Sequence, residues 1–490
     1  MTESDHLTPS LLEPQSRGGD IAEGGFSFQD HIILARIPHW LAQDGFTAML
    51  RENISDVEAK FFVPEQGFVT ELLEVKVHSL QPSHFWKEIK RFKEIDTGSQ
   101  NTYMDSPNTY RMFILVATGI SKDLEPLVNG LRRVRNPNDF YEQNSLVYSN
   151  SLKDYIQLVK KSGGTEEDAK FLLKKVEIEF DWSTAKLQGE ALFKQFFTDY
   201  FQEYNDLSIK TLDNIYNNLG VFLRQKRNQN ITRKDLENKL REKIPSNQLP
   251  DLRSILIYTA TDNADNPTHP GLRFDWADFY GGETRLIAQT ETWNELVIKL
   301  QKTRNWIENH RNTKRIKLLG NRRLSPCLAL GSVFSAVRGY AIEMEYRSQI
   351  WATDSHATNE TPAYPWINQT TGDMGDRLVV IISILRDIRS DVEKNLAKYQ
   401  LEGMPQLYIH GHQPIISAEH TNVATKGIKD LIVENLRCTG SKEIHLFFAG
   451  PAFLAMFLGH RLDATAPVIC YSWIGNEQYT RTCRLFSGLN

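Results

Sequence analysis

The C-terminal part of the chain contains an internal repeat, which restricts the possible folds more than any other feature of the sequence. Residues 314–346 align with residues 442–473. Each copy starts with Lys-x-Ile-x-Leu, passes through a turn of small residues into a segment that carries a Leu-Gly pair, and ends in an apolar run with aromatic residues. The two pairs are Leu330-Gly331 and Leu458-Gly459. Such a repeat indicates one supersecondary unit used twice, and its pattern predicts strand, helix, strand in each copy.

Further strands and helices alternate in front of the second copy. The apolar run RLVVIISI at 377–384 and the segment QLYIH at 406–410 have the composition of buried strands, and each is followed by a segment with helical spacing. Alternating strands and helices are typical of doubly wound parallel sheets. We therefore expect an α/β fold in which two related halves face each other across a pseudo-twofold crevice.

Ligands of open α/β sheets bind outside the carboxyl ends of the strands, so residues that follow the expected strands are candidates for ligand binding. Aromatic residues at strand ends could stack on nucleobases, with packing in the core as the alternative for each of them. A basic segment at 302–323 contains eight Lys and Arg residues against one acid, Glu308, and favours an anionic ligand. The candidates are Arg322, Arg323, Tyr346, Trp351, Arg386, Asp387, His412, Gly450, Pro451 and Trp473.

The rest of the chain differs in pattern from this C-terminal part. Residues 1–24 are polar and predict a flexible tail, and residues 25–150 alternate helix-like and strand-like segments as in a compact α/β domain. Residues 151–285 have mainly helical spacing and end in a loop-rich stretch, so they predict a helical middle section and connector. The part with the repeat would then occupy residues 286–490.

Composition limits the setting in which the protein works. The 490 residues carry a net charge of −4, so no overall positive field indicates a nucleic-acid partner, and any such surface must be local. The 4 cysteines show no Cys-x-x-Cys spacing, which fits a reducing compartment. The N-terminus lacks an apolar signal segment, and the longest apolar stretch, Leu378–Leu385, is too short to cross a bilayer. We expect a cytoplasmic protein without a membrane partner.

One strand-like segment, VTELLEVKVHSL at 69–80, places an acid and a lysine on the same face. Side chains alternate along a strand, so Glu74 and Lys76 project side by side. Asp56 precedes this strand at a distance compatible with a hairpin. Two carboxylates can hold Mg²⁺, and a lysine beside them can neutralise charge on a phosphodiester. The alternative is an exposed sheet face with an unimportant ion pair, because Glu-x-Lys also occurs elsewhere in the chain.

The following segment, SHFWKEIKRFKEI at 83–95, combines helical spacing with basic and aromatic residues. Lysine and arginine can contact phosphates while aromatic side chains anchor the helix. The basic residues are Lys87, Lys90, Arg91 and Lys93. They predict a DNA-binding helix, and the alternative is an amphipathic helix with core aromatics and solvated lysines.

The segment GGFSFQD, the acids Glu52 and Asp56, and the strand segment Leu-Glu-Val-Lys resemble the PD-(D/E)xK restriction-endonuclease superfamily. In that superfamily, the acid after the first hairpin and the (E/Q)-x-K strand bind metal, and a glutamine on the first helix supports the site. The resemblance implies catalytic roles for Asp56, Glu74, Lys76 and Gln29. It also implies Mg²⁺ or another divalent cation at Asp56 and Glu74.

The segment LGNRRLSPCLALGSVFSAVRGYAIEMEY, together with IHLFFAGPAFLAMFLGHRLDATAPVICYSW, resembles the SAVED domain. That family is a fusion of two CARF-like, Rossmann-type units and binds cyclic oligonucleotide second messengers. With its restriction-endonuclease-like N-terminal part, the whole chain resembles the SAVED-nuclease effectors of bacterial cyclic-oligonucleotide anti-phage (CBASS) systems. The resemblance implies that a cyclic oligonucleotide, expected to be a trinucleotide containing adenine, promotes self-association and turns on degradation of double-stranded DNA.

Two other functions stay open at this point. The chain could be a constitutive, restriction-type endonuclease whose C-terminal half only recognises DNA. It could also be a non-enzymatic nucleotide sensor that signals through a partner.

Overall fold

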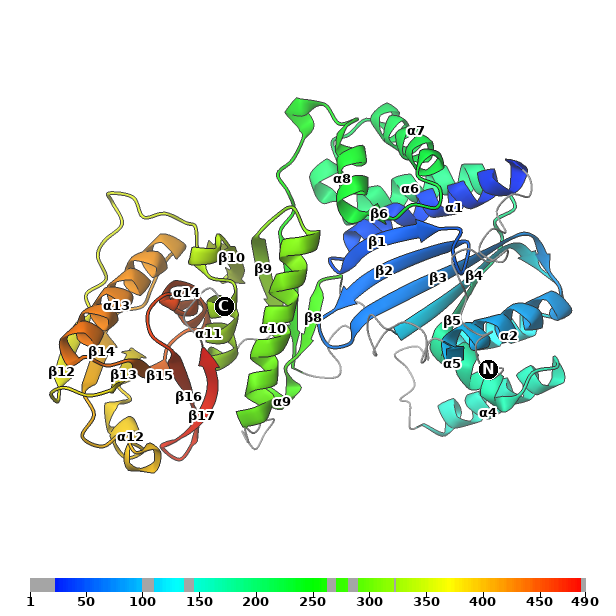
Figure 1. Ribbon diagram of the computed structural model, residues 1–490. Helices are drawn as coiled ribbons and strands as arrows, with labels where there is room; N and C mark the ends of the chain where they lie inside the picture. The colour runs from blue at the N-terminus through cyan, green and yellow to red at the C-terminus, as the bar shows by residue number, and fades with distance from the viewer. Residues whose placement is uncertain are drawn as a thin grey trace, which may run out of the picture. The chain divides into compact units, whose positions relative to one another are not determined.

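The computed structural model describes residues 23–98, 110–135, 145–261, 270–280, 290–320 and 323–485. The chain divides into two compact units, Met1–Asp251 and Leu252–Asn490. Each unit has its own sheets and helices (Figure 1). Among the described residues, no helix combines the length and the apolar content that crossing a membrane requires.

The first unit is built on one sheet with the strand order β5-β4-β3-β2-β1-β6. The strands β1, β2 and β3 form an antiparallel meander, and β4 and β5 continue the sheet in parallel with β3. The elements of this unit are α1 (Glu23–Ala42), β1 (Phe46–Arg51), β2 (Val57–Val63), β3 (Gly67–Leu80), α2 (Pro82–Gly98), β4 (Tyr110–Ile120), α3 (Glu125–Arg135), α4 (Leu146–Lys161), α5 (Glu166–Lys175), β5 (Val176–Glu179), α6 (Ala185–Tyr200), α7 (Ile209–Gln225), β6 (Ile231–Thr232) and α8 (Arg233–Arg241).

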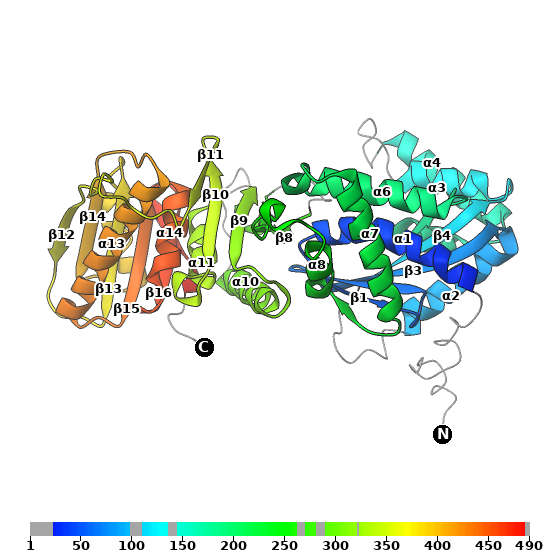
Figure 2. The same cartoon turned by 90° about the horizontal axis from the view of Figure 1, so that it is seen from above.

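Helices cover both faces of this sheet, and each face has its own core (Figure 2). On one face α1 packs with α6, α7 and α8, through residues such as Ile33, Phe193 and Leu219. On the other face α2 packs with α3, α4 and α5, through residues such as Phe85 and Leu172. Because the side chains of β3 alternate, Leu73 faces the first core and Leu72 faces the second.

The expected helical middle section at 151–285 is not a separate part of the structure. Helices α4 to α8 bury their apolar sides against the N-terminal sheet, and β5 and β6 become its two edge strands. The boundary therefore lies between Asp251 and Leu252 instead of near residue 285. An amphipathic helix is stable only where its apolar side is covered, and here both faces of the sheet provide that cover.

The second unit contains two sheets, with the strand orders β11-β10-β9-β7-β8 and β12-β14-β13-β15-β16-β17. The strands are β7 (Ile255–Ala260), β8 (Leu272–Asp275), β9 (Arg315–Gly320), β10 (Ala341–Tyr346), β11 (Gln349–Ala352), β12 (Ile367–Thr371), β13 (Arg377–Ile384), β14 (Gln406–Gly411), β15 (Glu443–Ala449), β16 (Val468–Gly475) and β17 (Gln478–Leu485). The helices are α9 (Ala277–Tyr280), α10 (Thr290–His310), α11 (Leu324–Val333), α12 (Arg389–Glu393), α13 (Ala418–Thr439) and α14 (Ala452–Leu462).

Apart from the additional antiparallel edge strand β12, the two sheets have the same strand order, which confirms the expected α/β fold with two related halves. In each half the first strand lies between the second and the third, and an antiparallel strand closes the far edge: β7, β8, β9, β10 and β11 correspond to β13, β14, β15, β16 and β17. The first half therefore begins with β7 at Ile255, inside the segment that the sequence assigned to the connector. This strand is short and alternates buried with half-buried residues, so its apolar signal is weaker than that of β13.

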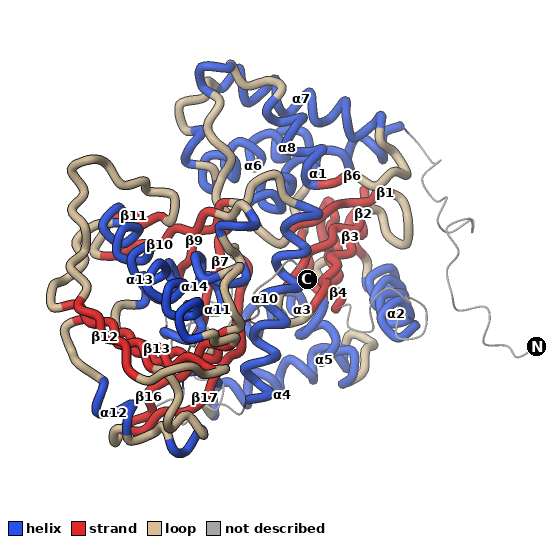
Figure 3. The backbone as a smooth tube through the Cα atoms, turned by 60° about the vertical axis from the view of Figure 1, so that its left-hand side comes forward, coloured by secondary structure: helices blue, strands red, loops and turns tan. Residues whose placement is uncertain are grey.

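Helices α11 and α14 pack against each other (Figure 3). The glycines of the two Leu-Gly pairs lie at this contact. A methyl group on Gly331 would come within 2.2 Å of the carbonyl oxygen of Met456, and one on Gly459 within 2.2 Å of the carbonyl oxygen of Leu328. The two glycines therefore permit a reciprocal close approach of the two helix backbones. The repeated sequence feature thus joins the two halves of the unit.

Candidate functional site

The pairing of β2 with β3 brings Asp56 next to Glu74. Val57 at the start of β2 is opposite Leu73, so the residue before it lies beside the middle of β3. The Asp56 carboxylate accepts a hydrogen bond from the backbone N–H of Val75, with 2.6 Å between Oδ2 and N. The hairpin expected from the sequence therefore forms, and it holds one acid against the strand that carries the other.

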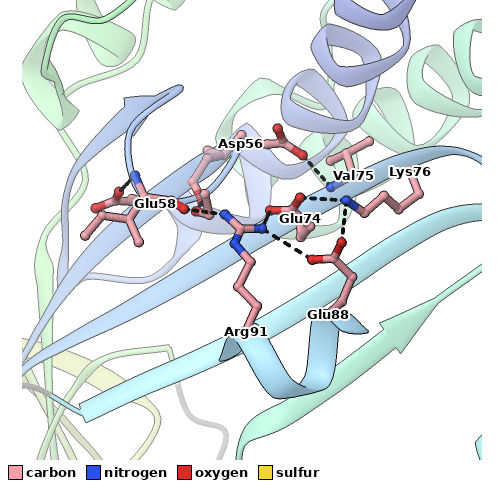
Figure 4. Close-up of polar contacts among 10 residues, drawn as sticks. Asp56, Glu58, Glu74, Val75, Lys76, Glu88 and Arg91 are labelled. Carbon is pink, nitrogen blue, oxygen red and sulfur yellow. Dashed lines mark hydrogen bonds and ion pairs between the residues drawn. The ribbon is translucent and has the colours of Figure 1, made fainter. Parts of the chain in front are cut away.

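Glu74 and Lys76 point to the face of the sheet that α2 covers. On the opposite face, Glu71 accepts a hydrogen bond from the indole of Trp40 in α1, and alternation along β3 turns Glu74 and Lys76 the other way. There they meet Glu88 and Arg91 of α2 (Figure 4). One cluster thus receives polar side chains from strand β3, from helix α2 and from the loop that precedes β2.

Four of these side chains form a closed ring of ion pairs. The Lys76 ammonium lies 2.8 Å from Glu74 Oε1 and 2.8 Å from Glu88 Oε1. The Arg91 guanidinium lies 2.7 Å from Glu74 Oε2 and 3.3 Å from Glu88 Oε2. We call this set of residues (Glu74, Lys76, Glu88 and Arg91) the ion-pair ring. Both carboxylate oxygens of Glu74 therefore face a cation.

Burial and neighbouring charge change the protonation of these groups. Burial, followed by the nearby Glu74 charge, raises the pKa of Asp56 to about 7. The hydrogen bond from Val75 and the positive charges of Lys76 and Arg91 lower this pKa but do not outweigh burial. Burial alone would lower the pKa of Lys76, but Glu74 and Glu88 outweigh it and raise that pKa. Burial would likewise raise the pKa of Glu88, but Lys76 and Arg91 outweigh it and lower that pKa.

The donor set of this cluster fits a hard divalent cation. Asp56 and Glu74 can supply oxygen ligands, and burial, followed by the Glu74 charge, raises the pKa of Asp56, so a bound cation would stabilise its charged form. The described residues contain no group of three or more histidine, cysteine or acidic side chains with metal-binding geometry. Mg²⁺ keeps several of its waters and is commonly bound by one or two carboxylates, so two acids are sufficient for it.

The predicted supporting residue Gln29 lies on α1, whereas the ion-pair ring is formed with residues of α2. Gln29 belongs to α1, is 6% exposed, and lies on the helix that covers the opposite face of the sheet. Its supporting role stays a prediction. The helix residues that do reach Glu74 and Lys76 are Glu88 and Arg91, which the sequence analysis did not assign to the metal site. Their i, i+3 spacing on the helix directly after β3 was the available signal.

The basic residues of α2 divide into two groups. Lys87 and Lys90 are exposed to solvent. Lys93 pairs with Asp168 of α5 at 2.7 Å, and Arg91 turns toward the acids of the ion-pair ring instead of outward to a nucleic acid. Phe85 and Phe92 are buried in the core beneath the helix. The exposed part of the predicted DNA-binding helix is therefore smaller than its sequence indicates.

In the second unit, the strand order reverses next to β13, since β14 lies on one side of it and β15 on the other. Ligands of open α/β sheets bind at such a point. Leu385, directly after β13, is exposed and has a left-handed backbone with φ of 65°, a strained conformation that is often found at functional sites.

Several of the predicted ligand contacts gather at this edge of the second sheet. The Arg386 guanidinium lies 5.7 Å from the centre of the Trp473 ring, and Trp473 is 37% exposed. Asp387 is exposed and accepts a hydrogen bond from the backbone N–H of Arg389. The exposed His412 lies 3.1 Å from His410, from Nδ1 to Nε2. Gly450 and Pro451 lead into α14, with Pro451 at its N-cap.

The predicted ligand-binding residues in the first half of this unit are less exposed than most of those at the edge of the second sheet, or lie outside the described residues. Trp351 is only 3% exposed and packs against Tyr346 and Phe453, so the core alternative holds for Trp351. Tyr346 belongs to the same aromatic group and is partly exposed. Arg323 is the N-cap residue of α11. Arg322 lies outside the described residues.

Comparison with known proteins relates the C-terminal part of the chain to a sensor family and the whole chain to several relatives. Residues 300–485 match the family model of SAVED, the SMODS-associated and fused to various effectors sensor domain. Two relatives called CD-NTase-associated protein 4, from Moraxella osloensis and an Acinetobacter strain, are 28% and 27% identical to this chain. Each alignment covers 98% of this chain and 100% of the relative.

The chain is also similar to solved structures of Cap4 receptors. The Acinetobacter baumannii Cap4 SAVED/CARF-domain containing receptor with the cyclic trinucleotide 3'3'3'-cAAA is 26% identical, with a TM-score of 0.81 over 95% of this chain and 100% of that chain. The Moraxella osloensis Cap4 receptor is 26% identical, with a TM-score of 0.75 over 95% of this chain and 100% of that chain. Residues 300–485 are therefore similar to the SAVED sensor domain, and the chain as a whole resembles the SAVED-domain effectors of CBASS anti-phage systems.

Proposed function

We propose that this protein is an endonuclease that cuts double-stranded DNA after its SAVED domain binds a cyclic trinucleotide. The observation that supports the nuclease is the meeting of Asp56, Glu74 and Lys76 on one hairpin and strand. The sensor is supported by the similarity to receptors solved with cyclic trinucleotides. Both features occur in one chain, which favours coupling between them.

In the nuclease site, Asp56 and Glu74 would hold Mg²⁺. When bound, the metal supplies a more acidic water and positive charge for the phosphate oxygens. Lys76 is fixed between Glu74 and Glu88, and its raised pKa keeps it charged. It would direct an ammonium N–H toward the scissile phosphate and offset the negative charge that develops there. Lys87 and Lys90 would contact DNA phosphates beside the site.

In the sensor, the ligand phosphates would meet Arg386 and the N-terminus of α14 at Pro451, where backbone N–H groups favour anions. Trp473 would stack on a base. Ligand binding would promote self-association of the chain. Self-association can control cutting only if the ligand binds the associated protein more tightly than the free protein. A ligand with equal affinity for both states does not change the equilibrium between them.

The test is digestion of a plasmid with Mg²⁺, with and without a cyclic tri-adenylate. We expect cutting only with the ligand. Lys76→Ala should lower the rate at least about a hundredfold, the usual effect of removing one preorganised charge, while calorimetry shows unchanged ligand binding. Lys60→Ala is the matched control, because Lys60 is an exposed lysine on β2 that contacts the Phe68 ring and not the acids.

The two alternative functions give different results in the same assay. A constitutive endonuclease cuts equally fast without any cyclic nucleotide. A non-enzymatic sensor binds the nucleotide and cuts under no condition. Either result would reject the proposal.

A further inference from the structure

In the ion-pair ring, each carboxylate oxygen of Glu74 faces one cation. Its Oε1 pairs with Lys76 at 2.8 Å and its Oε2 with Arg91 at 2.7 Å. Each of these oxygens keeps a second lone pair for a metal, but a divalent cation bound there would lie close to Lys76 or Arg91, and the like charges would repel each other, so metal binding favours movement of one of the two cations. The structure therefore contains a competition for Glu74 that the metal must win.

Arg91 is the cation that can leave. Lys76 follows Glu74 on the same rigid strand and is held from its other side by Glu88. Arg91 reaches the ring from α2 and has two other acceptors, the Glu88 carboxylate at 3.3 Å and the backbone carbonyl of Ile54 at 2.6 Å. When it releases Glu74, both of these contacts can persist. The carbonyl of Ile54 belongs to the loop that carries Asp56, so Arg91 also connects the two proposed metal ligands.

We propose that Arg91 is a resident counter-ion of Glu74 that a divalent cation displaces, and that Glu88 receives the displaced guanidinium. The ring contains two carboxylates and two cations, so their formal charges cancel without a metal. Arg91 and Glu88 are positioning residues in this scheme. They act on the metal through Glu74. The inference rests on the proposed metal site at Asp56 and Glu74.

The two residues should have opposite effects on metal affinity. Without Arg91, nothing competes with the metal for Glu74 Oε2, so the metal binds more tightly. Without Glu88, Arg91 has lost its alternative carboxylate and stays on Glu74, so the metal binds more weakly. This second effect requires Arg91, and it should disappear when Arg91 is also replaced.

The experiment measures Mn²⁺ binding to the full chain by electron paramagnetic resonance, without DNA or cyclic nucleotide. We expect Arg91→Gln to tighten binding about fivefold, the size of one well-formed ion pair, and Glu88→Gln to weaken it by a similar factor. Arg91→Met, which keeps the aliphatic stem, repeats the first result if the glutamine variant does not fold. In the double variant, Glu88→Gln should have no further effect.

Matched controls come from the same helix. Lys90→Gln removes one positive charge next in sequence to Arg91, but the Lys90 side chain is 81% exposed. Glu94→Gln removes one negative charge from an exposed position. Both should leave Mn²⁺ binding close to that of the unaltered protein. Equal effects of Lys90→Gln and Arg91→Gln would show a general charge effect and would overturn the inference.

The outcomes separate this inference from the proposed function. If the unaltered protein binds no Mn²⁺, or if Asp56→Asn does not weaken binding, the metal site itself is wrong, and the inference falls with it. If the protein binds Mn²⁺ through Asp56 and Arg91→Gln leaves or weakens the affinity, the metal site stands and the role of Arg91 is rejected. A Glu88→Gln effect that persists in the Arg91→Gln background rejects the role of Glu88.

Discussion

At the scale of single residues, burial determines the pH range in which the Asp56 carboxylate is charged. In water an aspartate is charged at any pH near neutrality, but here burial and the Glu74 charge raise its pKa to about 7. A raised carboxyl pKa means that the charged, metal-binding form is lost as the pH falls through that value. Metal binding must then release a proton.

We therefore predict a pH dependence for Mn²⁺ binding. As the pH falls below about 7, the affinity should drop by about tenfold per pH unit, because one proton competes with the metal for Asp56. Well above that pH the affinity should be constant. Titrations at several pH values test this. In Asp56→Asn the slope should vanish along with most of the affinity, and a pH-independent affinity in the unaltered protein would contradict the prediction.

The residue scale also shows how much of the site could be read from the sequence. Alternation along one strand predicted that Glu74 and Lys76 lie side by side. In the structure, Lys76 Nζ lies 2.8 Å from Glu74 Oε1. The partners Glu88 and Arg91 were not assigned to this site, because they reach it only through the packing of α2 on the sheet. The same limit applies to Trp351, which the sequence could not distinguish from an exposed stacking residue.

At the scale of secondary-structure elements, the glycines Gly331 and Gly459 set the distance between α11 and α14. Each would place a methyl group 2.2 Å from a carbonyl oxygen of the other helix, and backbone atoms cannot move aside as a flexible side chain can. The contact lies between the two halves of the unit. It explains why Leu-Gly occurs at the same place in both copies of the repeat.

We predict that Gly331→Ala and Gly459→Ala each destabilise the second unit by about 1–3 kcal/mol, as overpacking of a core does. Thermal and urea unfolding would measure the change. The matched control is Gly220→Ala in α7, where a methyl group would lie 3.5 Å from Leu34, an ordinary contact. That variant should be neutral or slightly more stable, since alanine favours helix more than glycine does. Unchanged stability of both Gly331→Ala and Gly459→Ala would contradict the prediction.

At the scale of the whole molecule, the chain consists of two units that each have their own sheets and buried residues. Such units can in principle fold alone. The sequence predicted a boundary near 285, whereas the structure puts β7 and β8 in the second unit. The strand β7 lies between β8 and β9, so its loss would leave β9 without a neighbour on that side.

We predict that residues 252–490 fold alone and bind the cyclic tri-adenylate as tightly as the full chain, without cutting DNA. The fragment 286–490, which starts at the boundary expected from the sequence, lacks β7 and β8 and should aggregate, because an uncovered strand edge pairs with other chains. Circular dichroism, size-exclusion chromatography and calorimetry would compare the two. A stable, ligand-binding 286–490 fragment would place the boundary where the sequence put it.

The sequence by itself determined the features that depend on local periodicity. These are the α/β class, the repeat that becomes two related halves, and the strand on which Glu74 and Lys76 share a face. The tertiary structure decided what lies opposite them: the closed ring formed with Glu88 and Arg91, the attachment of the helices after residue 145 to the first sheet, and the burial that raises the pKa of Asp56. Alternation and spacing fix the direction of a side chain from its own backbone. Contacts between elements depend on how separate segments pack, and no single segment of the sequence contains that information.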